Sequence, residues 1–83
     1  MSVYVDHARN RYGRMLLNHM MADTTDELLE MVSRLGLSAQ DRHHDHFDVC
    51  EAKRRKAIAL GALPVRSGDL VELRRRQRAE AKP

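Results

Sequence analysis

MLLNHMMADTTDELLEMVSRLGL, residues 15–37, is the stretch that decides the fold, because two hydrophobic periods follow each other in it. Residues 15–21 form an apolar run of strand length and predict a buried strand, with a short helix as the alternative. In residues 24–37 the apolar side chains Leu28, Met31, Val32 and Leu35 recur at helical spacing. The stretch therefore predicts a strand followed directly by an amphipathic helix.

The predicted helix carries a signal at each end. Thr24 followed three residues later by Glu27 is a capping box, which satisfies the first free backbone N–H groups of a helix. Gly36 stands where a left-handed residue commonly ends a helix, and Leu37 can then fold back on Val32. We therefore expect the helix to begin after Thr24 and to end before Gly36.

Shorter elements flank this unit on both sides. Residues 3–5 predict a strand that ends at Asp6, and residues 6–14 predict a loop. The later predictions are a strand over 46–49, a helix over 49–60 with Asp48 as its cap, an edge strand over 63–65 and a helix from 67–69 that frays over 76–83. The order strand, strand, helix, strand, helix, strand, helix predicts one domain, residues 1–83, of the α/β or α+β class with three or four short strands and about three helices.

Composition narrows the class of protein. The 83 residues include no Trp and a single Cys, so the core must be built from aliphatic side chains and Met, without an internal disulfide. No apolar run approaches the roughly 20 residues that span a bilayer, and the N-terminus lacks the pattern of a signal peptide. We therefore expect a cytoplasmic protein that does not contact a membrane.

Charge is distributed unevenly along the chain. Residues 1–50 hold five Arg and eight Asp or Glu, a balance of −3, whereas residues 51–83 hold ten Lys or Arg and four acidic residues, a balance of +6. The two values add to the net charge of +3. A basic C-terminal third fits a nucleic-acid backbone or an acidic partner protein, and it equally fits an ordinary solvated surface.

Side chains that can take part in acid–base or metal chemistry are most frequent in HHDHFDVCEAKRRK, residues 43–56. His46 and Asp48 are two residues apart in an extended segment and therefore share a face, as does His44. An imidazole and a carboxylate on one face can bind a divalent metal or act as a base with its orienting partner. The simpler interpretation is that Asp48 only caps the next helix, while His43 and His44 are exposed loop residues and the basic run is solvated.

Two further candidates come from the N-terminal strands. His19 lies inside an apolar run, where a hydrogen-bonded core histidine is the simpler interpretation and a site residue the alternative. Asp6 directly follows the first strand, a position that suits either a Mg²⁺ ligand or ordinary turn chemistry. If the later strands are parallel, Asp6, Asp48 and the Ser67-Gly68 turn meet at the carboxyl edge of the sheet.

VYVD, HMMADTTDELLEM, DHFDV and LGALPV resemble a family of small bacterial and phage proteins that is described only as a domain of unknown function. The resemblance covers nearly the whole chain, and this chain has Phe47 where tyrosine looks common in the family. The residues that the resemblance assigns to the family pattern are Asp6, His19, Asp45, His46 and Asp48, with His7, His43 and His44 peripheral. It implies no activity, substrate or cofactor.

Together these observations predict a polar site that acts on or binds a phosphate-bearing ligand. The predicted catalytic residues are His19, His46 and Asp48, the predicted phosphate-binding residues are Arg14 and Arg54, and the predicted ligands of a divalent metal are Asp6, His46 and Asp48. The reaction that fits is of the phosphodiesterase or nuclease type, either metal-dependent or driven by two histidines acting on RNA.

A non-catalytic accessory module is the alternative function. Such a module binds nucleic acid or a partner protein through the basic C-terminal third, with Arg74–Arg76 and Arg78 as contacts. The simpler interpretation of these arginines is a solvated tail. A homodimer with the Met-rich strand at its interface is compatible with both functions.

Overall fold

The computed structural model describes residues 2–43 and 45–81 of the chain. His44, which was predicted to share a face with His46 and Asp48, lies outside the described residues. The described strands are β1 (Val3–Val5), β2 (Asn10–Tyr12), β3 (Met15–Ala22), β4 (Phe47–Cys50) and β5 (Leu63–Pro64). The described helices are α1 (Thr25–Arg34), α2 (Glu51–Ala59) and α3 (Ser67–Ala81), with a short 3₁₀ turn over Ala39–Asp41. The predicted class, a small α+β domain, is confirmed.

Strand β3 is the centre of the sheet. Residues 15–17 of β3 pair with β2, residues 20–22 pair with β1 and residues 17–20 pair with β4, in each case antiparallel. Among the described strands, β5 alone is parallel to its neighbour, β1. The carboxyl edge expected of parallel strands is therefore formed by β1 and β5 alone, and β4 does not contribute to it.

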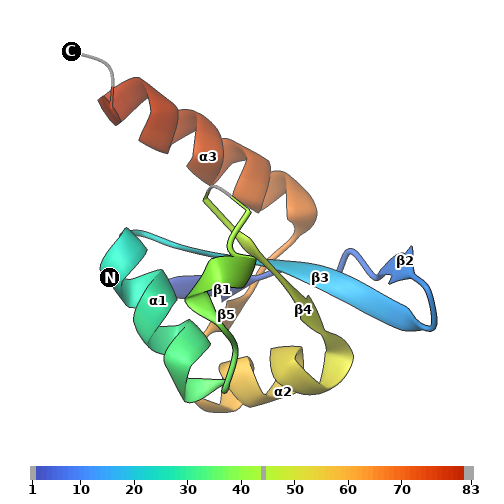
Figure 1. Ribbon diagram of the computed structural model, residues 1–83. Coiled ribbons are helices and arrows are strands. Elements are labelled where there is room, and N and C mark those ends of the chain that lie inside the picture. Colours follow the sequence, from blue (N-terminus) through green and yellow to red (C-terminus); the bar gives the residue numbers. More distant parts are fainter. Residues whose placement is uncertain (1, 44, 82–83) are drawn as a thin grey trace.

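Different helices pack against the two faces of this sheet. Met20, Phe47 and Val49 are buried on the face that packs against α1 and α2. Met21 points to the opposite face, where it packs against Leu70 and Leu73 of α3. Figure 1 shows α3 on one side of the sheet and α1 and α2 on the other. Because side chains alternate along a strand, His19 lies on the same face as Met21 and beneath α3.

Both predicted ends of α1 are confirmed. The Glu27 backbone N–H donates to the Thr24 hydroxyl at 3.2 Å, and the same hydroxyl donates to the Glu27 carboxylate at 2.8 Å. Gly36 has a φ of +74°, and the Leu37 N–H donates to the Val32 carbonyl at 3.0 Å. The local sequence therefore determines where this helix starts and stops.

Helix α2 begins two residues later than predicted, and the predicted capping role of Asp48 is wrong. The N-cap position of α2 is Cys50, and no side chain caps the helix there. Strand β4 continues through Cys50 because Val49 and Cys50 pair with Asn18 and Leu17 of β3. Asp48 consequently lies within a strand, and its carboxylate is free for other contacts.

Other differences from the prediction lie at the edges of the molecule. The predicted loop over 6–14 contains β2, which forms a hairpin with β3 through a turn at Gly13 and Arg14. Helix α3 continues through Ala81, past the start of the predicted frayed tail, and the Gln77 side chain donates to the Ala22 carbonyl at 2.8 Å. None of the helices in residues 2–43 and 45–81 is long and apolar enough to cross a membrane.

The Met-rich strand is largely occupied within its own domain. Met20 and Met21 are buried in the two cores on opposite faces of β3, whereas Met15 is 48% exposed at the hairpin end. Only the Met15 end of the strand is therefore available to a second copy of the chain. The homodimer itself stays a prediction.

Candidate functional site

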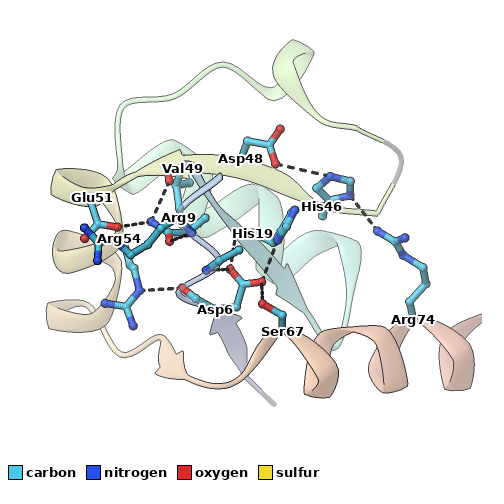
Figure 2. A network of polar contacts seen from close by, with 12 residues as sticks. Asp6, Arg9, His19, His46, Asp48, Val49, Glu51, Arg54, Ser67 and Arg74 are labelled. Atoms are coloured by element: carbon cyan, nitrogen blue, oxygen red, sulfur yellow. Dashed lines mark hydrogen bonds and ion pairs between the residues drawn. The ribbon is translucent and has the colours of Figure 1, made fainter. Parts of the chain in front are cut away.

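Polar side chains gather on the α3 face of the sheet. Asp6 follows β1, His19 lies in β3, and His46 immediately precedes β4. The imidazole rings of His19 and His46 meet edge to face, with their centroids 5.6 Å apart and their planes at 72°. Sequence positions 6, 19 and 46 are thus brought together by strand pairing, and Figure 2 shows the resulting network.

Asp6 is a buried carboxylate, 1% exposed, at the base of the site. One oxygen accepts the backbone N–H groups of His19 at 2.8 Å and Ala8 at 3.2 Å. The other lies 2.8 Å from Nδ1 of the His19 ring and accepts the Ser67 hydroxyl at 2.8 Å. Burial raises the pKa of Asp6, but the hydrogen bonds from His19, Ser67 and Ala8 outweigh it and hold this pKa below its usual value.

The state of Asp6 fixes the orientation and tautomer of His19. An ionised carboxylate only accepts hydrogen bonds, so Nδ1 of His19 must carry the proton that lies between them. In the neutral ring Nε2 is then the unprotonated nitrogen and the available base. His19 makes the hydrogen bond that the core interpretation expected, but its side chain is 33% exposed and is therefore only partly buried.

Ser67 does not complete a nucleophilic triad. Its hydroxyl donates to Asp6, whereas in a serine hydrolase the hydroxyl contacts the histidine. The contact instead joins the first residue of α3 to the end of β1. At this end β1 runs parallel to β5, so the expected carboxyl edge of parallel strands is formed here. Ser67 is a positioning residue for Asp6.

His46 has a hydrogen-bond partner in either protonation state. Its Nδ1 lies 3.2 Å from Nη2 of Arg74 and 3.3 Å from Oδ1 of Asp45. A neutral ring can accept from Arg74 at this nitrogen, and an imidazolium can donate from it to Asp45. Such a pair of alternatives suits a residue that takes up and releases a proton.

Arg74 and Asp45 hold each other beside His46. Nε of Arg74 donates to Oδ2 of Asp45 at 2.9 Å. Burial raises the pKa of Asp45, but the hydrogen bond with His46 and the charge of Arg74 outweigh it, so this pKa lies below its usual value. The interpretation of Arg74 as part of a solvated tail is therefore wrong.

A sequence signal for Arg74 was present. Ser67, Leu70, Val71 and Arg74 follow the spacing i, i+3, i+4, i+7 and so share one side of a helix. The predicted frayed tail began only at residue 76, so Arg74 already lay inside the predicted helix. The missing information was which part of the sheet this side of α3 covers, because Arg74 is held by Asp45 and His46 from a distant part of the chain.

Asp48 contacts His46 from outside the pocket. Its two oxygens lie 3.7 Å from Nε2 of His46 and 3.8 Å from Nε2 of His43, and its side chain is 33% exposed. These separations are ion-pair distances that are too long for hydrogen bonds. Figure 2 shows the His46 ring between Asp48 and Arg74.

The two predicted phosphate-binding arginines have other positions. Nε of Arg54 donates to the Asp6 backbone carbonyl at 2.7 Å, which anchors the end of β1 to α2. Arg14 lies in the exposed β2–β3 turn, five residues from His19 along an extended strand and hence about 17 Å away. The structure therefore brings Arg54 to the back of the site and leaves Arg14 outside it.

A hollow of about 130 Å³ opens between the sheet and α3. Its lining residues are Asp6, His19, Met21, His46, Ser67, Leu70, Val71 and Arg74. A liquid water occupies about 30 Å³, so the hollow has room for about four waters. This volume suits one group of the size of a phosphate. A larger hollow of about 400 Å³ lies between the ends of α1 and α3, and none of the described residues that line it is a histidine.

The side chains that line the hollow suit proton transfer better than metal binding. Among residues 2–43 and 45–81, no three His, Cys, Asp or Glu side chains are grouped so that they could hold a metal ion. The predicted metal ligands Asp6, His46 and Asp48 do not form such a group, and both oxygens of Asp6 already accept hydrogen bonds. What the hollow offers to a ligand is two imidazoles and a guanidinium.

Fold and site together define a small α+β domain with a His/Asp/Arg pocket between a mixed sheet and its C-terminal helix. The chain belongs to the DUF4031 family, described as proteins of unknown function, whose model matches residues 3–77. The resemblance recognised in the sequence is thereby confirmed, and the matched range includes both Ser67 and Arg74. No curated protein and no solved structure matches the chain.

Proposed function

We propose that the hollow lined by His19 and His46 is an acid–base site that binds a phosphoryl group and acts on a phosphate ester without a metal ligand. The observation that carries the proposal is the pair of imidazoles, 5.6 Å apart, in one phosphate-sized hollow. General acid–base catalysis needs one group that accepts a proton and another that donates one.

Hydrogen bonding prepares the two rings differently. His19 is held by Asp6 with Nε2 unprotonated in its neutral form, which makes it the candidate base. His46 is held between Arg74 and Asp45, so it retains a partner as an imidazolium and is the candidate acid. A phosphodiesterase-type reaction uses both functions, one for the attacking hydroxyl and one for the leaving oxygen.

The charges around the hollow support binding of an anion. Two nearby carboxylates already have partners, because Asp6 accepts four hydrogen bonds and Asp45 pairs with Arg74. Asp48, 3.7 Å from Nε2 of His46, lies outside the hollow. Arg74 has N–H groups besides the Nε that pairs with Asp45, so Arg74 and a protonated imidazole are the donors that a phosphate meets. Arg74 takes the role that the sequence assigned to Arg14 and Arg54.

Titration with inorganic phosphate, followed by NMR of the histidine ring protons, tests the proposal. We expect the ring signals of His19 and His46 to move together and to saturate, while those of the exposed His7 stay in place. Arg74→Gln should weaken phosphate binding about tenfold or more, because a charge-assisted hydrogen bond contributes about 1.5–3 kcal/mol.

Controls separate binding from unfolding. Arg76→Gln removes the same charge from the same helix without touching the hollow and should leave phosphate binding unchanged. His19→Gln and His46→Gln should keep the dispersed amide spectrum of a folded domain. If phosphate moves the signals of His7 as much as those of His19 and His46, the proposed site is not the one that binds it.

A further inference from the structure

The hollow can take one phosphate group but not a whole larger ligand. Its volume is about 130 Å³, whereas pockets that enclose entire small ligands measure roughly 300–1,000 Å³. Any ligand of nucleotide size or larger must therefore leave the hollow and continue over the neighbouring surface. The residues on that surface determine the class of ligand.

One side of α3 continues from the hollow as a basic surface. Ser67, Val71, Arg74 and Arg78 recur at i, i+4, i+7 and i+11, so they form a single stripe along the helix, here called the α3 stripe. The first three of these residues line the hollow, and Arg78 is exposed about 6 Å further along the helix axis.

Charge along the α3 stripe favours an extended polyanion. The α3 stripe itself carries two Arg, Arg74 and Arg78, and no acidic residue, and it runs toward the end of α3 that Figure 1 shows reaching away from α2. Val71, which is 58% exposed, adds an apolar rim to the hollow, next to Arg74. A chain with repeated phosphates, and with bases whose flat faces can pack on an apolar side chain, meets both features.

We infer that the ligand is single-stranded RNA, which lies along the α3 stripe, places one phosphodiester in the hollow and is cleaved there by its own 2′-hydroxyl. This inference rests on the proposed function, since it uses His19 and His46 as base and acid. RNA is favoured over DNA because the hollow supplies acid and base groups, while the 2′-hydroxyl supplies the nucleophile from within the substrate.

The reaction balances without a further reactant. Nε2 of His19 takes the proton of the 2′-hydroxyl, and the 2′-oxygen forms a bond to phosphorus. The bond between phosphorus and the 5′-oxygen breaks, and the leaving oxygen takes a proton from Nδ1 of the His46 imidazolium, the nitrogen that lies beside Arg74. The products are a 2′,3′-cyclic phosphate end and a 5′-hydroxyl end, and the two histidines exchange protons with solvent before the next turnover.

Binding is tested with a fluorescein-labelled 12-nucleotide RNA in buffer that contains a metal chelator, with fluorescence anisotropy as the readout. Each phosphate contact to a single strand contributes about 0.7 to the slope of log K against log salt concentration. Arg78→Gln should weaken binding and reduce this slope by about 0.7. Arg76→Gln, the same change on the opposite side of α3, should alter neither value.

Cleavage is tested with the same RNA, the matched DNA and a DNA strand that contains one ribonucleotide. We expect the RNA to be cut, the DNA to stay intact and the mixed strand to be cut only after its ribonucleotide, leaving a cyclic phosphate. His19→Gln and His46→Gln should each lower the rate at least a hundredfold, because general acid–base groups contribute about 10²–10⁴-fold. Both variants should still bind RNA.

The two proposals fail in distinguishable ways. If phosphate perturbs His19 and His46 but the RNA is neither bound nor cut, the RNA assignment is wrong and the proposed function stands. If the RNA binds along α3 while inorganic phosphate leaves both rings unaffected, the proposed function is wrong and the RNA cleavage falls with it. Equal cutting of DNA and RNA overturns the 2′-hydroxyl step.

Discussion

The carboxylate of Asp6 serves the backbone and the site at the same time. Its Oδ1 accepts the N–H groups of His19 and Ala8 and so ties β3 to the chain that leaves β1. Its Oδ2 accepts the Ser67 hydroxyl and the His19 ring proton, which fixes the tautomer of the candidate base. Replacement of Asp6 must therefore change stability as well as any activity.

Asp6→Asn should lower the free energy of unfolding by about 2 kcal/mol at pH 7, because the amide replaces an acceptor of charge-assisted hydrogen bonds. The pKa of Asp6 is lowered by folding, so its stabilising effect is complete above the unfolded value of about 3.9 and is lost as pH falls through the lower folded value. An amide does not titrate. The gap between wild type and variant should therefore narrow as the pH falls below about 4, as measured by urea unfolding at pH 7, 5 and 3.

Asp41→Asn, at an exposed position of the 3₁₀ turn, is the matched control and should change stability by less than about 0.5 kcal/mol. A gap between wild type and Asp6→Asn that stays the same from pH 7 to pH 3 would contradict the stabilising role of the ionised carboxylate. The same urea series shows whether protonation of Asp6 accounts for the loss of stability at low pH.

At the scale of elements, α1 and α2 differ in how their starts are determined. Helix α1 starts at a side-chain cap that the sequence displays, namely Thr24 with Glu27. Helix α2 starts where β4 stops pairing with β3, and no side chain caps it. Strand pairing extends over Phe47–Cys50, and these paired backbone groups outweigh the single cap that Asp48 could have formed.

Thr24→Ala should destabilise the domain by about 1 kcal/mol, because it removes the hydroxyl that accepts the Glu27 N–H. Thr25→Ala makes the same chemical change one residue later, inside the helix and at an exposed position, and should have an effect within about 0.5 kcal/mol. Thermal and urea unfolding of the two variants give the comparison. Equal losses for both would mean that the cap contributes no more than helix propensity.

Half of the basic run in α2 makes contacts with other elements of the fold. Nζ of Lys53 donates to the Leu35 carbonyl at 2.6 Å, at the end of α1, and Nε of Arg54 donates to the Asp6 carbonyl at 2.7 Å. Two residues of the Lys53–Lys56 run therefore satisfy backbone carbonyls of other elements, while Arg55 and Lys56 are exposed. The simpler interpretation of the run as a solvated surface therefore holds for Arg55 and Lys56 and not for Lys53 and Arg54.

At the scale of the whole molecule, a single sheet separates two cores of unequal size. The larger lies under α1 and α2 and includes Phe47, which is 1% exposed. The smaller lies under α3, where Met21, Leu70 and Leu73 pack together. The hollow occupies the part of the α3 face that the smaller core leaves uncovered, next to the parallel β1–β5 pair.

Phe47→Ala should cost about 3–5 kcal/mol, since it removes the aromatic side chain of the larger core. A domain of 83 residues has about 4–12 kcal/mol of stability in total, so this variant should be close to unfolding at 25 °C. Tyr12→Ala, at a position that is 69% exposed, should cost less than about 0.5 kcal/mol. Circular dichroism during urea unfolding distinguishes the two, and a mild effect of Phe47→Ala would mean that the core can collapse around the lost ring.

Elements with local signals could be predicted from the sequence. Strand β3 and helix α1 with both of its ends follow from residue types at short spacing, and the resemblance to the family gave the pattern of Asp6, His19, Asp45, His46 and Asp48. Tertiary structure alone decided the strand directions, the start of α2, the full length of α3 and the selection of Arg74 in place of Arg14 and Arg54. The physical reason is that these features depend on hydrogen bonds and packing between segments far apart in the chain, such as Asp6 with Ser67 and His46 with Arg74, whose energies no short stretch contains.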